Sequence, residues 1–429
     1  MEHIKALRGF RDIYFDEIER FNLIGHAARA YFHLLGYREI EIPILEKTEL
    51  FKRSIGDATD IVEKEMFTFA DRSGDSVSLR PEATAGIVRA YLQASLYAKE
   101  RASRLFTAGP MFRHERPQKG RFRQFYQTDV EVFGIADPMA DVELIWMVFL
   151  ILGRLGVKNY TVEINSVGCK GCRDEFRKAL VAFLESKKEG LCSDCVGRLD
   201  RNPLRIFDCK NEQCNDAIRE APVIFDYLCP ECREHFDDCL SRLDQFHVPF
   251  VVNKRLVRGL DYYTRTVFEF TSADLGSQKA FAAGGRYDNL VEEMGGPSVP
   301  GTGLAIGMER LALLIGELPP REAPLYFLAT VGEQAEAWLI PILDAFVSSQ
   351  MRLAYAQPAR SLKSQLKYAD SLGADYALIL AGEEVSGGVV LMRNMKDGTQ
   401  KELPLDPAVL PRLVREWRTP ESRQKADDE

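Results

Sequence analysis

The residues between Phe112 and Gly134 concentrate side chains that suit an anionic ligand. Seven lysines and arginines against two acids occur between residues 100 and 125, although the whole chain has a net charge of −8. Such a local excess of positive charge attracts anions, and planar guanidinium groups pair well with phosphate oxygens. The same segment carries a carboxylate at Glu115, a ring at Phe125 and an amide at Gln127. It therefore predicts a nucleotide site, the alternative being a solvated loop whose arginines only confer solubility.

An antiparallel hairpin is expected to position these groups. Pro117 and Gly120 favour a turn, and the alternation in YQTDVEVF, residues 126–133, is typical of a strand. Because residues at even spacing share one face of a strand, Gln127 and Glu131 should lie on the same side of it.

A second group of polar residues lies at a predicted helix start. In LRPEATAG, residues 79–86, Pro81 opens the helix, and Glu82 and Thr84 fall at or just inside its N-terminus. From the residues alone, the favoured interpretation is a pair that caps the helix.

The remaining pattern alternates helices and strands. We expect a helix over 16–35, a strand over 38–45 interrupted by Pro43, a hairpin over 65–80, a buried helix from Asp137 and a strand over 160–167. Farther along, 257–270 should form two strand segments around a bend, and 300–314 a glycine-spaced strand that runs into a helix. GELPPREAP, residues 316–324, marks a domain boundary, and a βαβ pattern with a β-rich end follows it.

Length and composition describe an ordinary globular protein with room for two or three domains. The 429 residues are 46% hydrophobic and 28% charged, and MEHIKALRGF has no apolar core typical of a secretory signal. The longest apolar run, 144–152, is half of a bilayer span, so no membrane partner is expected. We expect a cytoplasmic protein with reduced cysteines.

Nine cysteines lie between Cys169 and Cys239, mostly in close pairs. The interval between Cys172 and Cys192 fits a zinc ribbon, which predicts structural zinc at Cys169, Cys172, Cys192 and Cys195, with Cys209, Cys214, Cys229 and Cys232 as a second set of four. The alternative is a set of reduced thiols in a small helical domain.

Several of these segments resemble the class II aminoacyl-tRNA synthetases. FRHERPQKGRFRQF resembles motif 2 of that class, the helix followed by REIEIPIL resembles motif 1, and PGTGLAIGMERLALL resembles motif 3. RGLDYYTRTVFE and AAGGRYDNLVEEMGG are similar to two motifs of the histidyl-tRNA synthetases and their non-catalytic relatives. RSLKSQLKYADSLGADYALIL resembles the anticodon-binding domain of several class II enzymes.

The resemblance implies an α+β fold: a class II catalytic domain with a mainly antiparallel sheet flanked by helices, a helical insertion and a C-terminal α/β anticodon-binding domain. The implied ranges are 1–165 and 247–320 for the catalytic domain, 166–246 for the cysteine-rich insertion, 324–415 for the anticodon-binding domain and 418–429 for a disordered tail. It also implies a homodimer whose interface includes motif 1.

The implied reaction activates L-histidine with ATP and Mg²⁺ and transfers histidine to tRNA(His). Arg113 would bind the α-phosphate and the histidine carboxylate, Arg310 the distal phosphates, and Arg258 would act near the α-phosphate as a metal ion does in sister enzymes. The remaining roles carried over by position are Glu115, Phe125 and Arg121 for ATP, Glu82, Thr84 and Gln127 for the ammonium group, Glu131, Tyr262 and Tyr263 for the imidazole, and Arg116 and Gln118 for the tRNA acceptor end. A carboxylate and a phenol can each meet one imidazole nitrogen.

Three other functions would account for parts of the sequence. One is the non-catalytic, histidine-sensing regulatory subunit of ATP phosphoribosyltransferase, which usually lacks the C-terminal domain and the arginines of motifs 2 and 3. A second is a class II synthetase for another amino acid, which RGLDYYTRTVFE disfavours. A third is a zinc-ribbon module that binds nucleic acid, which accounts only for the insertion.

Overall fold

The computed structural model describes residues 3–56, 59–201, 203–209, 211–258, 260, 262–276, 279–318, 323–356 and 361–417. The chain divides into two compact units, residues 1–318 and 319–429, which are described separately. The tail expected to be disordered, 418–429, lies outside the described residues. No helix within the described ranges is long and apolar enough to cross a membrane.

The first unit is built on an eight-stranded sheet with the order β1-β5-β6-β11-β10-β9-β7-β8. Neighbouring strands are antiparallel except β1 with β5 and β7 with β8, which are parallel. The strands are β1 (Arg38–Glu39), β5 (Ser103–Phe112), β6 (Gln124–Phe133), β7 (Thr161–Ser166), β8 (Val251–Val252), β9 (Thr264–Thr271), β10 (Ala280–Arg286) and β11 (Gly301–Gly307). This is the mainly antiparallel sheet that the family resemblance implies.

Four helices cover one face of this sheet. They are α1 (Asp16–Leu34), α5 (Met139–Arg154), α9 (Pro230–Gln245) and α11 (Met308–Leu314), and their apolar residues form one core with the strands. The chain enters α5 through a cap, because the Asp137 carboxylate accepts a hydrogen bond from the backbone N–H of Met139 at 2.7 Å. It leaves α1 through Gly36, whose φ of 78° belongs to the left-handed region that favours glycine at a helix end.

The opposite face packs against α3 (Thr84–Gln93) and α10 (Leu290–Glu293) through a second core. The chain around them forms α2 (Thr48–Ile55), α4 (Leu96–Lys99), a short π-helix (Ile61–Glu65) and a three-stranded sheet of β2 (Leu45–Lys47), β4 (Ser76–Leu79) and β3 (Thr68–Ala70). Polar side chains of β6 point towards this face, so the candidate site lies on it.

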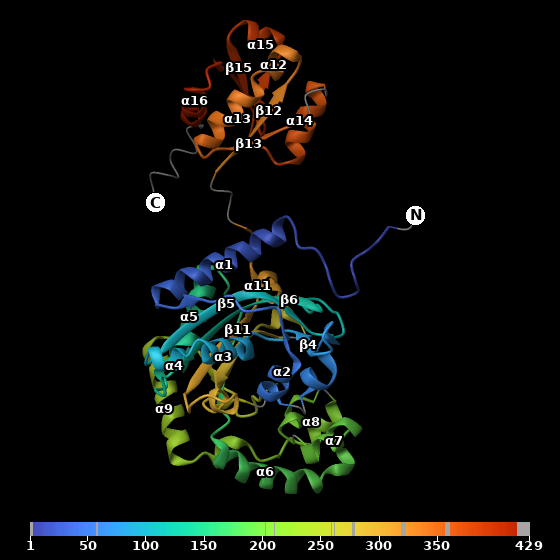
Figure 1. Ribbon diagram of the computed structural model, residues 1–429, viewed down its shortest axis with the longest axis vertical. Coiled ribbons are helices and arrows are strands. Elements are labelled where there is room, and N and C mark those ends of the chain that lie inside the picture. The colour runs from blue at the N-terminus through green and yellow to red at the C-terminus, as the bar shows by residue number, and fades with distance from the viewer. Residues whose placement is uncertain are drawn as a thin grey trace. The chain divides into compact units, whose positions relative to one another are not determined.

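Between β7 and β8 the chain makes a helical insertion. It contains α6 (Lys170–Glu185), α7 (Ser193–Arg201), α8 (Glu212–Ala217) and α9, with 3₁₀ turns at Lys188–Gly190, Pro203–Asp208 and Ile224–Tyr227. In Figure 1, α6, α7 and α8 lie together, away from β5 and β6, and they share a small apolar core of their own.

The second unit has a five-stranded sheet with the order β13-β12-β14-β15-β16. Its strands are β12 (Leu325–Thr330), β13 (Arg352–Tyr355), β14 (Tyr376–Leu380), β15 (Val389–Asn394) and β16 (Gln400–Pro404). The helices are α12 (Glu333–Glu336), α13 (Leu339–Ser348), α14 (Leu362–Ser371), α15 (Gly382–Ser386) and α16 (Leu410–Glu416). The first three strands are parallel and the last two are added antiparallel.

Three local predictions differ from the structure. The strand over 38–45 is two short strands, β1 and β2, because Pro43 between them has no N–H to donate to a ladder. Among the described residues of 257–263 no strand forms, so only the second predicted segment, β9, exists. The β-rich end also contains the short helices α15 and α16.

Candidate active site

Glu131 is the centre of a buried hydrogen-bond cluster between β6 and α3. Thr84, the first residue of α3, donates from Oγ1 to Glu131 Oε1 at 2.6 Å, and the Tyr287 hydroxyl donates to Oε2. Gly303 on β11 pairs with Glu131, and a Cβ at this position would lie 1.6 Å from Glu131 Oε2. The glycine therefore leaves the space that the carboxyl group occupies.

Burial raises the pKa of Glu131 well above its usual range, although the hydrogen bonds from Thr84 and Tyr287 lower it. The pKa of Asp129, two residues earlier on the same face, is also raised well above its usual range by burial and then by the nearby Glu82. Three carboxyl groups thus share a small buried volume. An arriving cation or hydrogen-bond donor would stabilise their ionised forms.

Glu82 caps α3, as the interpretation from the residues alone predicts. Its carboxylate accepts hydrogen bonds from the backbone N–H groups of Thr84 and Ala85, both at 2.9 Å. Burial still raises its pKa against these hydrogen bonds and the nearby Arg113. A carboxylate has further lone pairs, so capping leaves it able to accept from a ligand.

Tyr262 and Tyr263 are buried and lie beside this cluster. Their ring centroids are 4.7 Å apart, and the Tyr262 ring packs edge-on against Tyr287 with centroids 5.6 Å apart. Burial raises the pKa of Tyr262 well above its usual value, with smaller contributions from Tyr263, Glu82 and Glu131. The two phenols therefore remain neutral donors at the edge of the carboxyl cluster.

Arg258 approaches the same two tyrosines from the other side. Its guanidinium lies over the Tyr263 ring, 5.5 Å from the centroid, and forms an ion pair with Glu269 on β9. Burial disfavours the charged guanidinium, but Glu269 and Tyr263 outweigh it and the pKa of Arg258 is raised. No described residue accepts a hydrogen bond from its buried Nε.

Gln127 lies on the same face of β6, between the carboxyl cluster and the hairpin loop. Its side-chain Oε1 is buried, and no donor among the described residues reaches it. A buried acceptor without a donor is costly, so this oxygen fits a ligand that brings an N–H group.

Three arginines converge where β5, the hairpin loop and α11 meet. Arg113 donates from Nε to the Pro81 carbonyl at 2.8 Å, and Arg310 donates from Nη1 to the Ala280 carbonyl at 2.6 Å. Burial lowers the pKa of Arg121, and repulsion from Arg310 and Arg113 lowers it further. Burial and then Arg113 likewise lower the pKa of Arg310, while burial lowers that of Arg113. Several partly desolvated cations that repel one another form a site prepared for an anion of high charge.

The other residues assigned to ATP lie around these arginines. Phe125 packs its ring under Arg113, 5.3 Å from the guanidinium carbon to the centroid. Glu115 forms an ion pair with Arg121 across the loop. At the tip, Gln118 and Arg121 pair through their backbones, and the Arg116 and Gln118 side chains are exposed. Arg116 and Gln118 therefore lie outside the buried part of the site.

The structure does not bring together the four cysteines predicted as one zinc site. Cys169 and Cys172 lie with Cys229 and Cys232, whereas Cys192 and Cys195 lie with Cys209 and Cys214. The predicted grouping is corrected accordingly. Interval along the chain does not decide this pairing, because the insertion folds back so that its first and last helices meet.

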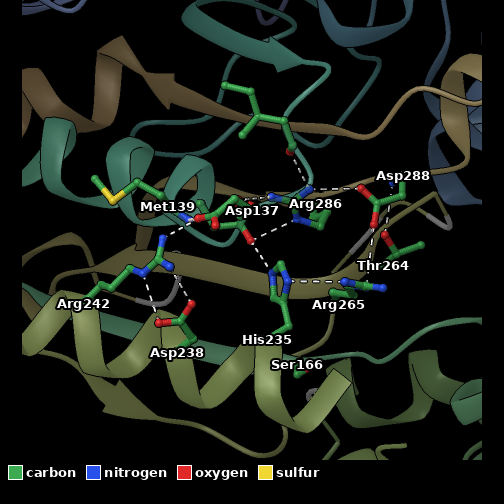
Figure 2. A network of polar contacts seen from close by, with 12 residues as sticks. Asp137, Met139, Ser166, His235, Asp238, Arg242, Thr264, Arg265, Arg286 and Asp288 are labelled. Carbon is green, nitrogen blue, oxygen red and sulfur yellow. Dashed lines mark hydrogen bonds and ion pairs between the residues drawn. The ribbon is translucent and has the colours of Figure 1, made fainter. Parts of the chain in front are cut away.

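A buried network of ion pairs and hydrogen bonds holds the end of β10 in place, on the side of the sheet away from the site (Figure 2). Arg286 Nε donates to Asp141 Oδ2 at 3.0 Å, and His235 Nε2 lies 2.9 Å from the same oxygen. Burial raises the pKa of Asp141, but Arg286 and His235 outweigh it and hold that pKa below its usual value. Because Tyr287 follows Arg286 directly, this network positions a residue of the Glu131 cluster.

Sequence reasoning did not assign roles to Tyr287, Asp141 or Arg286. Two of them lie in AAGGRYDNL, within the segment that is similar to a histidyl-tRNA synthetase motif. Successive residues at a strand end point to opposite faces, so one of Arg286 and Tyr287 had to face the site. Which of the two does so depends on the orientation of the sheet.

An antiparallel sheet whose hairpin arginine meets an arginine from a strand–helix unit, beside a buried cluster of polar side chains, defines the catalytic domain of a class II aminoacyl-tRNA synthetase. A family model described as histidyl-tRNA synthetase matches residues 9–311. The chain belongs to the histidyl-tRNA synthetase family.

Similar proteins extend over nearly the whole chain. A histidine–tRNA ligase of Desulfosudis oleivorans is 48% identical over 409 residues, which cover 94% of this chain and 96% of that protein. One of Aquifex aeolicus is 48% identical over 403 residues, covering 94% and 99%. The apo histidyl-tRNA synthetase of S. aureus superposes with a TM-score of 0.79 at 32% identity, covering 96% and 99%.

The fold alone is also similar to a Bacillus halodurans structure. That structure, named as an ATP phosphoribosyltransferase regulatory subunit/histidyl-tRNA synthetase, matches with a TM-score of 0.64 at 20% identity and covers 89% of this chain. Fold similarity at this identity does not separate a catalytic from a regulatory protein.

Proposed function

We propose that the chain is a histidine–tRNA ligase. It activates L-histidine with MgATP to histidyl-adenylate and pyrophosphate, and then transfers histidine to the 3′ end of tRNA(His). The observation that carries the proposal is the position of the Glu131 cluster on the same face of the sheet as the converging arginines. An imidazole-binding end and a phosphate-binding end are both needed for this reaction.

The imidazole is read by Glu131, Tyr262 and Tyr263, and we add Tyr287 to this set. Hydroxyl groups and a carboxylate can satisfy both ring nitrogens, which apolar side chains cannot do. A site built on such hydrogen bonds rejects amino acids that lack them, since its buried polar groups are then left unpaired.

The ammonium group of histidine is held by Glu82, Thr84 and Gln127. The buried Gln127 Oε1, which no described donor reaches, and the Glu82 carboxylate supply acceptors for its N–H groups. Arg113, one strand away, holds the carboxylate of histidine and directs it towards the α-phosphorus.

The arginines accelerate the first step by orientation and charge stabilisation. Attack of the histidine carboxylate on the α-phosphorus increases negative charge on phosphoryl oxygens, which positioned guanidinium groups stabilise. Arg113 and Arg258 act at the α-phosphate, Arg310 and Arg121 at the distal phosphates, and Glu115 and Phe125 hold the adenine. The unpartnered Nε of Arg258 is available for this contact.

The tRNA and dimer assignments rest on exposed surfaces. Arg116 and Gln118 at the hairpin tip are exposed and could meet the acceptor end, and Lys363 and Lys367 on α14 are exposed on the second unit, proposed to bind the anticodon. Leu34, Ile44 and Leu45, in the motif 1 segment, are 79%, 42% and 43% exposed. Exposed apolar residues there support a homodimer formed around motif 1. The similarity to histidine–tRNA ligases, which act in translation, supports a cytoplasmic location.

The test is ATP/pyrophosphate exchange by purified protein with each of the twenty amino acids, with an Arg258→Ala variant alongside. Exchange with histidine alone, lost in the variant, is expected. Binding of histidine in calorimetry without any exchange would instead identify the regulatory subunit of ATP phosphoribosyltransferase. Exchange with a different amino acid would identify another class II synthetase.

A further inference from the structure

Eight of the nine cysteines form two clusters that the aminoacylation chemistry does not use. The outer cluster consists of Cys169, Cys172, Cys229 and Cys232, and the inner cluster consists of Cys192, Cys195, Cys209 and Cys214. In each cluster the second cysteine of each pair is buried and the first is half-buried. Two sets of four thiols with the same burial pattern are more than a small apolar core requires.

The sulfur positions match a single tetrahedral ion. Within each cluster the four Sγ atoms lie within 4.8 Å of one another. The Cys169 and Cys172 Sγ atoms are 3.6 Å apart, and those of Cys192 and Cys209 are 3.9 Å apart. A Zn–S bond of about 2.3 Å gives a tetrahedral S–S edge of about 3.8 Å. A disulfide bond would require an S–S distance of about 2.05 Å, so these sulfurs are free thiols arranged around a common centre.

Helix starts and backbone N–H groups surround these sulfurs. Cys169 and Cys229 are the N-cap residues of α6 and α9, and Cys192 directly precedes α7, so three of the four cysteine pairs stand at a helix start. The backbone N–H of Cys229 donates to Cys172 Sγ at 3.1 Å.

The inner cluster repeats this backbone contact. The N–H of Cys192 donates to Cys214 Sγ, also at 3.1 Å. Such contacts to the ligand sulfur are typical of the shell around a bound metal. In each cluster, the backbone N–H of the first cysteine of one pair thus donates to the buried second cysteine of the other pair.

The outer cluster lies where the insertion leaves the catalytic sheet. Gly168 has a φ of 63°, and a Cβ there would lie 2.5 Å from Cys172 Cβ, so the backbone passes close to the cluster. The next residue of α6, Arg173, donates from Nη1 to the Tyr263 carbonyl at 3.0 Å. The outer cluster therefore joins the two ends of the insertion beside the histidine-binding residues.

The inner cluster lies within the insertion itself. Cys195 and Cys214 belong to the small core that α6, α7 and α8 share. Small cores of this kind commonly need a metal or a disulfide for stability. The cysteines of the inner cluster all lie, in sequence, between the two pairs of the outer cluster, and two such nested sets of free thiols fit bound metal ions.

We propose that the insertion binds two structural zinc ions, one in the outer cluster and one in the inner cluster, each through four cysteine thiolates. A d¹⁰ zinc ion has no redox chemistry and accepts four thiolates in a closed tetrahedral site, which suits a structural role. The outer ion holds α6 and α9 at the edge of the catalytic sheet. The inner ion holds the rest of the insertion together.

The first test is the metal content of the full-length protein purified without chelator, by inductively coupled plasma mass spectrometry. Two zinc ions per chain are expected. A mercurial reagent that titrates thiols should release two equivalents of zinc, detected with a chromophoric indicator. This measurement needs no variant. A trace amount of zinc, iron in its place, or cysteines found as disulfides would overturn the proposal.

Two matched sets of four substitutions test the nested pairing. Cys169→Ser, Cys172→Ser, Cys229→Ser and Cys232→Ser together should leave one zinc per chain, because the inner cluster is intact. Cys169→Ser, Cys172→Ser, Cys192→Ser and Cys195→Ser together should leave none, because both clusters lose two ligands. The reverse result would show sequential pairing. Cys239→Ala, outside both clusters, should keep two zinc ions and serves as the control.

Discussion

Thr84 and Glu131 are joined by a 2.6 Å hydrogen bond that connects the first turn of α3 to the C-terminal part of β6. The bond places a hydroxyl and a carboxyl group from segments 47 residues apart in one buried cluster. Tyr287 completes the cluster from the end of β10. Because all three groups are buried, any change in one leaves the others incompletely paired.

Tyr287→Phe should weaken histidine use while leaving ATP binding unchanged. The substitution removes one hydrogen bond to a buried carboxyl group without changing the size of the ring much. Hydrogen bonds to charged groups contribute about 1.5–3 kcal/mol, so kcat/KM for histidine should fall roughly 10- to 100-fold. Steady-state ATP/pyrophosphate exchange at varied histidine and varied ATP measures both parameters.

Tyr160→Phe is the matched control for this prediction. Tyr160 packs against Phe270 on the other face of the sheet, and it should show wild-type kinetics when its hydroxyl is removed. An unchanged kcat/KM for histidine in Tyr287→Phe would remove Tyr287 from the imidazole-binding set.

Arg310→Ala should abolish most of the activation step without unfolding the protein. Loss of one positioned charge at a developing oxyanion typically costs roughly 10²–10³-fold in kcat. The substitution also removes repulsion on Arg121, and this relief offsets the loss of the hydrogen bonds to the Gly120 and Ala280 carbonyls. Pyrophosphate exchange and thermal unfolding, measured on the same preparation, separate the two effects.

Arg154→Ala supplies the comparison for Arg310→Ala. Arg154 ends α5 on the opposite face of the sheet and is exposed. Equal losses of activity in the two variants would contradict a specific phosphate-binding role for Arg310.

The elements that bring together the arginines proposed to bind phosphate could largely be predicted from sequence. The hairpin and the strand–helix unit carry strong local patterns, and their arginines lie where two consecutive elements meet. The burial of Glu309 could not be predicted, since a glutamate next to an arginine at a helix start is typical of an exposed surface pair. In the structure it is 5% exposed and accepts from the backbone N–H of Tyr126. Burial of one residue in a helix turn depends on strands distant in sequence.

For a similar reason, the sequence could not predict which pairs of cysteines form each cluster. Spacing along the chain indicates four-ligand sites but not which pairs meet. Cys172 and Cys229 are 57 residues apart and still in contact, because α6 and α9 both start at the edge of the sheet. The role of Tyr287 likewise depended on which face of the sheet holds the site.

Glu309→Gln should change how the stability of the catalytic unit depends on pH. Burial raises the pKa of Glu309 to about 7, against the hydrogen bond from Tyr126. The folded state then holds a proton that the unfolded state releases from about pH 4.5, so the free energy of unfolding falls as pH rises from there to about 7.

The amide in Glu309→Gln does not titrate and can still accept from Tyr126. The variant should therefore be more stable than the wild type above pH 7, by at most about 3 kcal/mol for the shift from 4.5 to about 7. Below pH 4.5 the two proteins should be alike. Urea unfolding at pH 5, 6, 7 and 8 measures the difference, and a constant difference across this range would contradict the assignment.

Arg286→Met should destabilise the catalytic unit strongly and also impair histidine binding. Arg286 and Asp141 are both fully buried and form an ion pair. Removing the guanidinium leaves the buried carboxylate with His235 as its one remaining side-chain partner among the described residues, which should cost about 3–5 kcal/mol. Replacing both residues, as in Asp141→Leu with Arg286→Met, should cost less than the sum of the single changes, because neither charge is then left alone. Urea unfolding followed by circular dichroism gives the three free energies.

In the single variant that still folds, KM for histidine should rise while KM for ATP stays the same, since Tyr287 adjoins Arg286. Additive free energies with unchanged histidine kinetics would show that the two residues neither pair nor position the site.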